Sequence, residues 1–177
     1  MRIIAGQFRS RRLKSVPGLV VRPTPDRLRE ALFNILAPRL NGTVFLDAYA
    51  GSGAVGIEAL SRGAAAVVLV EKNPRALAII RENLNSLQIE DSITVVKGEA
   101  ASAIGKHAAG IIFIDPPYDQ AAEYDRSFKA AAVSGCGLVI AQHPSRMTLS
   151  ERVGGLQRVR IVKQGDNALS FYDRIEE

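Results

Sequence analysis

The segment IIFIDPPYD, residues 111–119, joins a short apolar run to residue types that can hold a polar ring. The run of three isoleucines and a phenylalanine predicts a strand buried on both faces of a sheet. Pro116 and Pro117 have no N–H to donate, so the strand ends there and the backbone stays extended. The turn therefore fixes the Asp115 carboxylate, the Pro116 carbonyl and the Tyr118 ring. Two acceptors beside an aromatic face could hold an amino group on a planar ring, although a plain strand terminator would explain Asp-Pro-Pro as well.

A second segment, VFLDAYAGSGAVGIEAL over residues 44–60, has the order strand, glycine-rich turn and helix. Gly51, Gly53 and Gly56 match the pattern G-x-G-x-x-G, in which glycines let the backbone approach a ligand and the helix start offers free N–H groups. Glu71 closes the next apolar run, 20 residues after Gly51, and is suitably spaced to accept hydrogen bonds from ribose hydroxyls. A tight turn without a ligand is the alternative.

Acidic residues near the ends of three successive strands bear on which cofactor such a turn would bind. Asp47 ends the first strand, Glu71 ends the second, and Glu99 follows the third. A dinucleotide would bring a negative pyrophosphate, whereas S-adenosylmethionine brings a sulfonium, an ammonium, a ribose and an adenine. Three acids therefore favour S-adenosylmethionine over NAD. Glu99 could accept from the adenine amino group, or it could be only an acid that stabilises a helix N-terminus.

These segments belong to an alternation of strands and helices that predicts a three-layer α/β fold with a mostly parallel sheet. Strands are expected at about 43–48, 66–71, 93–97, 110–115, 136–142, 157–163 and 168–174. Helices are expected at about 54–62, 74–87, 99–106, 119–133 and 145–151. Because only QGDN separates the last two strands, we predict a seven-stranded sheet with one antiparallel terminal strand.

The N-terminal segment differs in character from the rest of the chain. RIIA and RRLKSV predict a small β-hairpin around Gly6, and a helix follows, with Thr24 as its N-cap and its end near Pro38. Residues 1–39 hold nine Lys and Arg against two acids, a net charge of +7; since the whole chain carries +5, residues 40–177 carry −2. We predict that residues 1–39 form a polyanion-binding extension of a domain over residues 40–177, with a solvated tail as the alternative.

The composition is that of an ordinary globular protein, with 177 residues, 47% hydrophobic and 23% charged. No apolar run is long enough to span a membrane and no signal peptide is recognisable, so we expect a cytoplasmic protein. Cys136 is the single cysteine, which excludes an intrachain disulfide. His107 and His143 lie far apart in the sequence, and we expect no metal site.

Taken together, these motifs resemble a known family. The combination of Asp47, the glycine turn, Glu71 and Asp115-Pro-Pro-Tyr resembles class I S-adenosylmethionine-dependent methyltransferases, in the branch that methylates exocyclic or amide nitrogens. Five segments are similar, in order, to the bacterial 16S rRNA guanine-N2 methyltransferase family of the RsmD type: RIIAGQFRSRRL, RPTPDRLREALFNIL, AGSGAVGIEALSRGA, IDPPYD and QGDNALSFYDR. The resemblance covers nearly the whole chain.

The resemblance implies a Rossmann-like fold and transfer of a methyl group from S-adenosylmethionine, leaving S-adenosylhomocysteine, to the N2 amine of guanine 966 of 16S rRNA in the small ribosomal subunit. The implied cofactor-binding residues are Asp47, Gly51, Ser52, Gly53, Glu71, Lys72, Glu99, Ala100 and Asp115. The implied catalytic residues are Asp115, Pro116 and Tyr118. The implied RNA-contacting residues are Arg2, Arg9, Arg11, Arg12, Arg22, Thr24, Arg27, Pro117 and Tyr118. We expect a monomer.

Gln142 and the late GDN segment depart from the family pattern, which usually has an acid and GDT at these places. Glu99 likewise stands where Asp or Asn is usual. The substrate-side loop and the adenine contact therefore follow least directly from the resemblance.

Other functions are compatible with parts of the pattern. An adenine-N6 DNA methyltransferase would use the same Asp-Pro-Pro-Tyr turn, but such enzymes usually need an additional recognition domain. A protein-glutamine methyltransferase characteristically carries Asn-Pro-Pro-Tyr. An NAD-dependent dehydrogenase would leave the turn unexplained, and a non-catalytic RNA-binding module would not need intact motifs at four strand ends.

Overall fold

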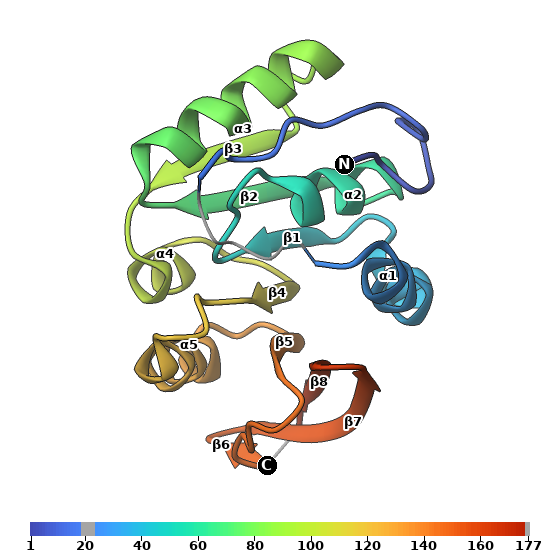
Figure 1. The fold of residues 1–177 in the computed structure, drawn as a ribbon. Helices are drawn as coiled ribbons and strands as arrows, with labels where there is room; N and C mark the ends of the chain where they lie inside the picture. Colours follow the sequence, from blue (N-terminus) through green and yellow to red (C-terminus); the bar gives the residue numbers. More distant parts are fainter. Residues whose placement is uncertain (19–23, 176–177) are drawn as a thin grey trace.

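The computed structural model describes residues 1–18 and 24–175, which form one eight-stranded sheet between two layers of helices (Figure 1). The strands are β1 (Val44–Asp47), β2 (Ala66–Glu71), β3 (Ile93–Lys97), β4 (Ile111–Ile114), β5 (Leu138–Pro144), β6 (Arg152–Val153), β7 (Leu156–Gln164) and β8 (Asn167–Arg174). The helices are α1 (Asp26–Leu40), α2 (Ala54–Ser61), α3 (Pro74–Leu87), α4 (Ala100–Lys106) and α5 (Ala121–Val133).

The strand order is β3-β2-β1-β4-β5-β8-β7-β6, and β1 to β5 run parallel. β1 pairs with β2 on one side and β4 on the other, so the chain changes its winding direction there, and ligands of such sheets bind beyond the strand ends at this point. The predicted mostly parallel α/β sheet is confirmed, and β8 is antiparallel to both its neighbours, as expected of a terminal strand. The count of seven strands is wrong, because Arg152–Val153 pairs with β7 as an additional short strand.

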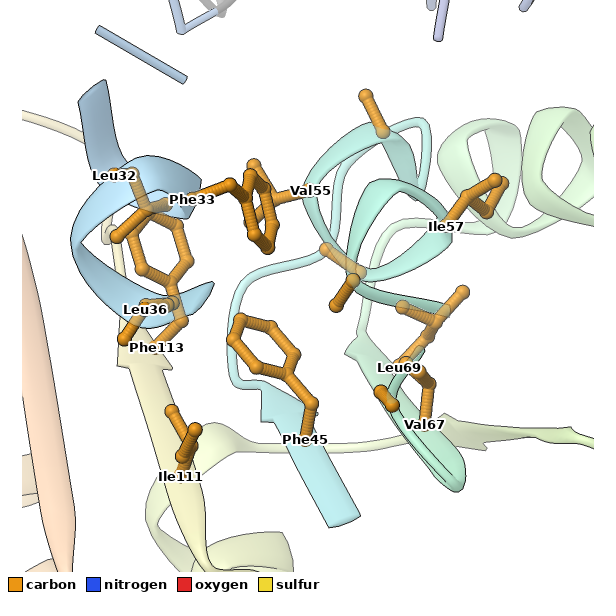
Figure 2. Packing of buried hydrophobic residues seen from close by; sticks show 14 of the residues in the cluster. Leu32, Phe33, Leu36, Phe45, Val55, Ile57, Val67, Leu69, Ile111 and Phe113 are labelled. Atoms are coloured by element: carbon orange, nitrogen blue, oxygen red, sulfur yellow. The ribbon is translucent and has the colours of Figure 1, made fainter. Parts of the chain in front are cut away.

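Alternating residues of the central strands supply two hydrophobic layers. Phe45 of β1 and Phe113 of β4 point toward α1, α2 and α3, with their ring centroids 6.4 Å apart. Their sequence neighbours Leu46 and Ile112 point toward α4 and α5. Figure 2 shows the first layer, in which side chains of α1 and α2 pack over β1, β2 and β4. Each such buried side chain contributes about 1.5–3 kcal/mol to folding, so the central strands hold the site rigidly.

Helix α1 differs from its prediction at both ends. It begins at Asp26 and Thr24 does not cap it, because the Thr24 hydroxyl is hydrogen-bonded to a side chain of β5 instead. It continues through Pro38 to Leu40, which is buried. The Thr43 hydroxyl donates to the carbonyl of Arg39 at 2.7 Å, so the last turn is closed by a residue beyond the helix.

The expected N-terminal hairpin is present in a short form, in which Arg2 and Arg12 make an antiparallel bridge. Its backbone hydrogen bonds run from the N–H of Ile3 to the Arg11 carbonyl at 3.0 Å and from the N–H of Leu13 to the Met1 carbonyl at 2.9 Å. The backbone N–H groups of Ile4 and Ala5 donate to the Glu58 carboxylate of α2, at 2.9 and 3.0 Å. Hydrogen bonds to a carboxylate are stronger than those to a neutral acceptor, so Glu58 anchors the residues that lead into the turn. The segment is therefore a short hairpin held against α2, drawn as the blue trace in Figure 1.

Residues 145–151 form no helix, contrary to the prediction. The carbonyls of Leu149 and Ser150 accept hydrogen bonds from the side chains of Arg158 in β7, at 2.9 Å, and Tyr172 in β8, at 2.8 Å. These two side chains hold the end of the segment against β7 and β8 in an irregular conformation.

Candidate active site

Two adjoining cavities lie beyond the ends of β1 to β4. The larger, of about 640 Å³, is lined by residues 115–120 and by residues that follow β2 and β3, including Glu71, Lys72, Glu99 and Ala100. The smaller, of about 100 Å³, is lined by residues of α1 and of the turn after β1, including Arg29, Asp47 and Ser52. Tyr49, Gly51 and Asp115 line both cavities. The sequence-predicted cofactor residues and the Asp-Pro-Pro-Tyr turn therefore meet at one place.

The three glycines of the G-x-G-x-x-G pattern have different structural roles. Gly51 and Gly53 have φ of +57° and +85°, a conformation that side chains other than glycine rarely adopt. Gly56 lies inside α2, and a Cβ added there would be 2.3 Å from Cδ2 of Leu69. Its N–H also donates to Oδ2 of Asp47 at 3.2 Å. The first two glycines therefore shape the turn, and the third lets α2 pack directly against β2.

The Glu71 carboxylate fixes the backbone of the glycine turn after β1 through hydrogen bonds. One carboxylate oxygen accepts from the N–H of Gly51 at 2.9 Å, and the other accepts from the N–H groups of Lys72 and Asn73, both at 2.8 Å. Carboxylate oxygens each have two acceptor sites, so Glu71 can still accept from a ligand hydroxyl. Its role in ribose binding stays a prediction, while its role in fixing the glycine turn is a structural finding.

Asp47 and Asp115 both line the smaller cavity, and the pKa of each carboxyl is raised. Burial raises the pKa of Asp47 to about 7, and the charge of Glu71 adds to the effect. Burial also raises the pKa of Asp115 well above its ordinary value, with a further contribution from the charge of Asp47. Asp47 is buried and Asp115 is half-buried. Two carboxyls that line one small cavity resist double ionisation, and a cation bound beside them would relieve the repulsion.

The Asp-Pro-Pro-Tyr turn leaves the end of β4 and faces the larger cavity. Tyr118 is 43% exposed, and its hydroxyl donates to Oδ1 of Asn167, the last residue of the GDN segment, at 2.5 Å. On the other side of the site, the Thr24 hydroxyl donates to Oε1 of Gln142 in β5 at 3.0 Å. Two of the three departures from the family pattern, Gln142 and the GDN segment, thus contact residues expected at the substrate. The hydrogen bond to Asn167 holds the Tyr118 ring in position.

Glu99 and Lys72 lie at the outer rim of the larger cavity. Nζ of Lys72 is 3.5 Å from the Glu99 carboxylate, and both side chains are more than half exposed, so the pair adds little stability. Ala100, which opens α4, is buried beneath them. These residues line the cavity as predicted, while their contact with an adenine stays a prediction.

The basic N-terminal segment is docked on the domain. Ile3 and Leu13 are buried in the hydrophobic core on the α1–α3 side of the sheet, and Arg11 donates to the Ser86 carbonyl of α3 at 2.6 Å. Five of the arginines expected to contact RNA are exposed: Arg2, Arg9, Arg11, Arg12 and Arg27. Arg22 lies outside the described residues. The segment is therefore fixed in place, and whether it contacts RNA stays a prediction.

Two residues that line the site were not singled out from the sequence. Arg29 is fully buried and lines the smaller cavity. Its helical spacing places it on the same face of α1 as the buried residues Phe33, Leu36 and Leu40, and this spacing is the sequence signal that could have revealed its burial. Tyr49 lines both cavities, and its hydroxyl is hydrogen-bonded to Glu123 and Ser127 of α5. Nothing in its local sequence distinguishes it.

Within residues 1–18 and 24–175, no three His, Cys, Asp or Glu side chains are grouped so that they could hold a metal ion. In the same part of the chain, no helix combines the length and the apolar character that a membrane span requires.

Comparison with known proteins fits this geometry. A family model described as Conserved hypothetical protein 95 matches residues 1–173. The chain belongs to this family, the RsmD-type methyltransferases. It is 33% identical to YlbH of Bacillus subtilis, over 98% of this chain and 99% of that protein. It is 42% identical to ribosomal RNA small subunit methyltransferase D of Escherichia coli, in a match that spans 67% of this chain and 60% of that protein.

Solved structures agree with the family assignment. The yhhF structure from Escherichia coli has a TM-score of 0.85 at 33% identity, covering 98% of this chain and 97% of its own. The TTHA0928 structure from Thermus thermophilus has a TM-score of 0.80 at 34% identity, covering 98% of this chain and 99% of its own. The RsmD-type fold thus extends over essentially the whole chain described here.

Proposed function

We propose that this protein uses S-adenosylmethionine to methylate small-subunit ribosomal RNA, at the exocyclic N2 amine of a guanine, and that guanine 966 of 16S rRNA is its target. The observation that carries the proposal is the position of Asp115-Pro116-Pro117-Tyr118, which lines the same cavity as the cofactor-type residues Glu71 and Glu99. The names of the Escherichia coli and Haemophilus influenzae relatives, both ribosomal RNA small subunit methyltransferase D, support the RNA substrate.

The residues present fit S-adenosylmethionine. The glycine turn and Glu71 suit a ribose, and the rim near Glu99 and Ala100 suits an adenine. The buried carboxyl of Asp47 and the half-buried carboxyl of Asp115 suit a cation. When bound, this cofactor supplies an electrophilic methyl group on a sulfonium. A dinucleotide fits less well, because its pyrophosphate would meet a buried acid at the end of β1.

Asp115 and its neighbours would orient the target amine. The guanine N2 lone pair is delocalised into the ring, so the amine is a weak nucleophile. The Asp115 carboxyl and the Pro116 carbonyl can accept its two N–H groups and direct the lone pair at the methyl, and alignment of this kind can contribute about 7–11 kcal/mol. The raised pKa of Asp115 also makes its carboxylate a better base for the proton that the methylated nitrogen must lose.

Tyr118 would hold the base itself. A base enters such a cavity only after leaving its helical stack, and stacking on an aromatic ring restores about 1–3 kcal/mol. The hydrogen bond to Asn167 fixes the ring, so less conformational entropy is lost when the base binds.

The test is transfer of labelled methyl from S-adenosylmethionine to small ribosomal subunits from cells that lack the gene, followed by nucleoside analysis. We expect the label in N2-methylguanosine, with naked 16S rRNA and assembled subunits compared in parallel and Asp115→Ala as the inactive control. Label in another nucleoside would overturn the guanine-N2 assignment. No transfer to either RNA, with cofactor binding intact, would overturn the RNA substrate and return the question to DNA or protein.

A further inference from the structure

The smaller cavity contains two buried side chains of opposite charge with atoms that lack hydrogen-bond partners. Among the described residues, Nε and Nη1 of Arg29 and Oδ1 of Asp47 have none. The Arg29 side chain and Asp47 are each 1% exposed, and both residues line this cavity. An unsatisfied buried polar group is destabilising, more so when it is charged, and such groups call for an explanation such as a missing ligand.

The rest of the Arg29 guanidinium is held firmly. Nη2 donates to the Arg2 carbonyl at 2.7 Å and to Oδ1 of Asp26 at 3.0 Å. Nε is 4.0 Å from Oε2 of Glu58, whose two oxygens already accept from the N-terminal loop and from Arg62. These contacts fix the plane of the guanidinium and leave Nη1 without a protein partner.

We propose that Arg29 is a cofactor-binding residue that holds the carboxylate of the methionine part of the cofactor, while Oδ1 of Asp47 holds its ammonium group. An α-amino acid group carries these two charges, which match a buried arginine and a buried aspartate that line one small cavity. Because Gly51, Tyr49 and Asp115 line both cavities, a ligand with its nucleoside in the larger one can extend its amino-acid end into the smaller. The inference rests on the proposed use of S-adenosylmethionine and adds the residue that recognises its carboxylate.

The distinguishing experiment compares two ligands that share the thioadenosine part. Binding of S-adenosylhomocysteine and of 5′-methylthioadenosine, which lacks the amino-acid group, is measured calorimetrically for the wild type and Arg29→Gln. We expect Arg29→Gln to weaken S-adenosylhomocysteine about 10- to 100-fold, the range for a hydrogen bond to a charged group, and to leave 5′-methylthioadenosine unchanged. An equal loss for both ligands, or no loss for either, would overturn the assignment.

Arg62→Gln is the matched control. Arg62 also pairs with Glu58, at 2.8 Å, but does not line the smaller cavity, so this variant removes an arginine from the same carboxylate and should bind both ligands as the wild type does. If Arg29→Gln does not fold, the wild type is tested with decarboxylated S-adenosylhomocysteine. About 10- to 100-fold weaker binding than the parent ligand upholds the assignment, and equal binding overturns it.

The inference and the proposed function fail in different ways. If Arg29 is assigned wrongly, methyl transfer to ribosomal RNA persists while the ligand comparison shows no carboxylate-specific loss. If the RNA substrate is wrong, transfer fails while the ligand comparison stands. If the wild type binds no S-adenosylhomocysteine, both the cofactor and the Arg29 assignment fall.

Discussion

The raised pKa of Asp47 makes a quantitative prediction about stability in the absence of ligand. In the unfolded chain this carboxyl ionises near its ordinary pKa of 3.8, and in the folded protein only near 7. Between these values the folded protein binds more protons than the unfolded chain, so the free energy of unfolding falls as the pH rises. At 1.36 kcal/mol for each pKa unit, the difference between 3.8 and about 7 amounts to about 4 kcal/mol.

Asp47→Asn removes this dependence. We expect its free energy of unfolding to fall less than that of the wild type as the pH rises from about 4 to about 7, with the two curves separating by about 4 kcal/mol over that range. The assay is urea unfolding followed by circular dichroism at constant ionic strength. Asp125→Asn, at an exposed position on α5, controls for the loss of a carboxylate as such.

Asp115 adds to this separation, because the charge of Asp47 helps to raise the pKa of Asp115. Saturating S-adenosylhomocysteine should flatten the wild-type curve, since a bound ammonium favours the ionised form of Asp47. Parallel curves for wild type and Asp47→Asn across this pH range would refute the claim that folding holds the ionised Asp47 carboxylate at an energetic cost when no ligand is added.

Three further predictions concern the reaction, the packing and the RNA surface. Asp115→Ala should reduce methyl transfer about 100- to 10,000-fold, as expected for loss of an acid–base group, and retain calorimetric binding of S-adenosylhomocysteine; near-normal transfer would contradict the proposed mechanism. Gly56→Ala should lower the free energy of unfolding in urea by about 1–3 kcal/mol, because the added Cβ meets Leu69 at 2.3 Å. Gly105→Ala, in α4 with nothing within 4 Å of its added Cβ, should raise it by about 1 kcal/mol, and equal effects at the two glycines would rule out the packing explanation. Replacing the exposed Arg9 and Arg12 by Gln should reduce the slope of log affinity for RNA against log salt concentration. The expected reduction is about 0.7–0.9 for each phosphate that the protein no longer neutralises. Lys129→Gln, at an exposed position on α5, is the control, and an unchanged slope for the arginine variant would show that Arg9 and Arg12 do not bind RNA.

The sequence by itself determined the central sheet and the residues at its strand ends. Short, continuous apolar runs rich in β-branched residues and flanked by Gly, Pro and acids are typical of buried strands with polar ends. The strands leading to Asp47, Glu71 and Asp115 and the turns after them were therefore predictable. Parallel strands end at one edge of a sheet, which brings these acids to one site without further information.

Tertiary structure decided the elements whose backbone bonds to distant side chains. The position of the short N-terminal hairpin depends on Glu58, which accepts from the N–H groups of Ile4 and Ala5. Residues 145–151 form no helix, and their last carbonyls accept from Arg158 and Tyr172. Local propensity carries no record of such partners, which lie at sequence separations of 54 and 53 for the two bonds to Glu58.

The same reason explains which site residues were missed. Arg29 counts in the sequence as one more basic residue of a charged segment, and only the packing of α1 buries it beside Asp47. Asn167 is chemically an ordinary turn residue until the β7–β8 hairpin brings its side-chain Oδ1 to the Tyr118 hydroxyl. Sequence determines which groups can do the chemistry, whereas burial and long-range packing decide which of them are left unsatisfied and therefore ready for a ligand.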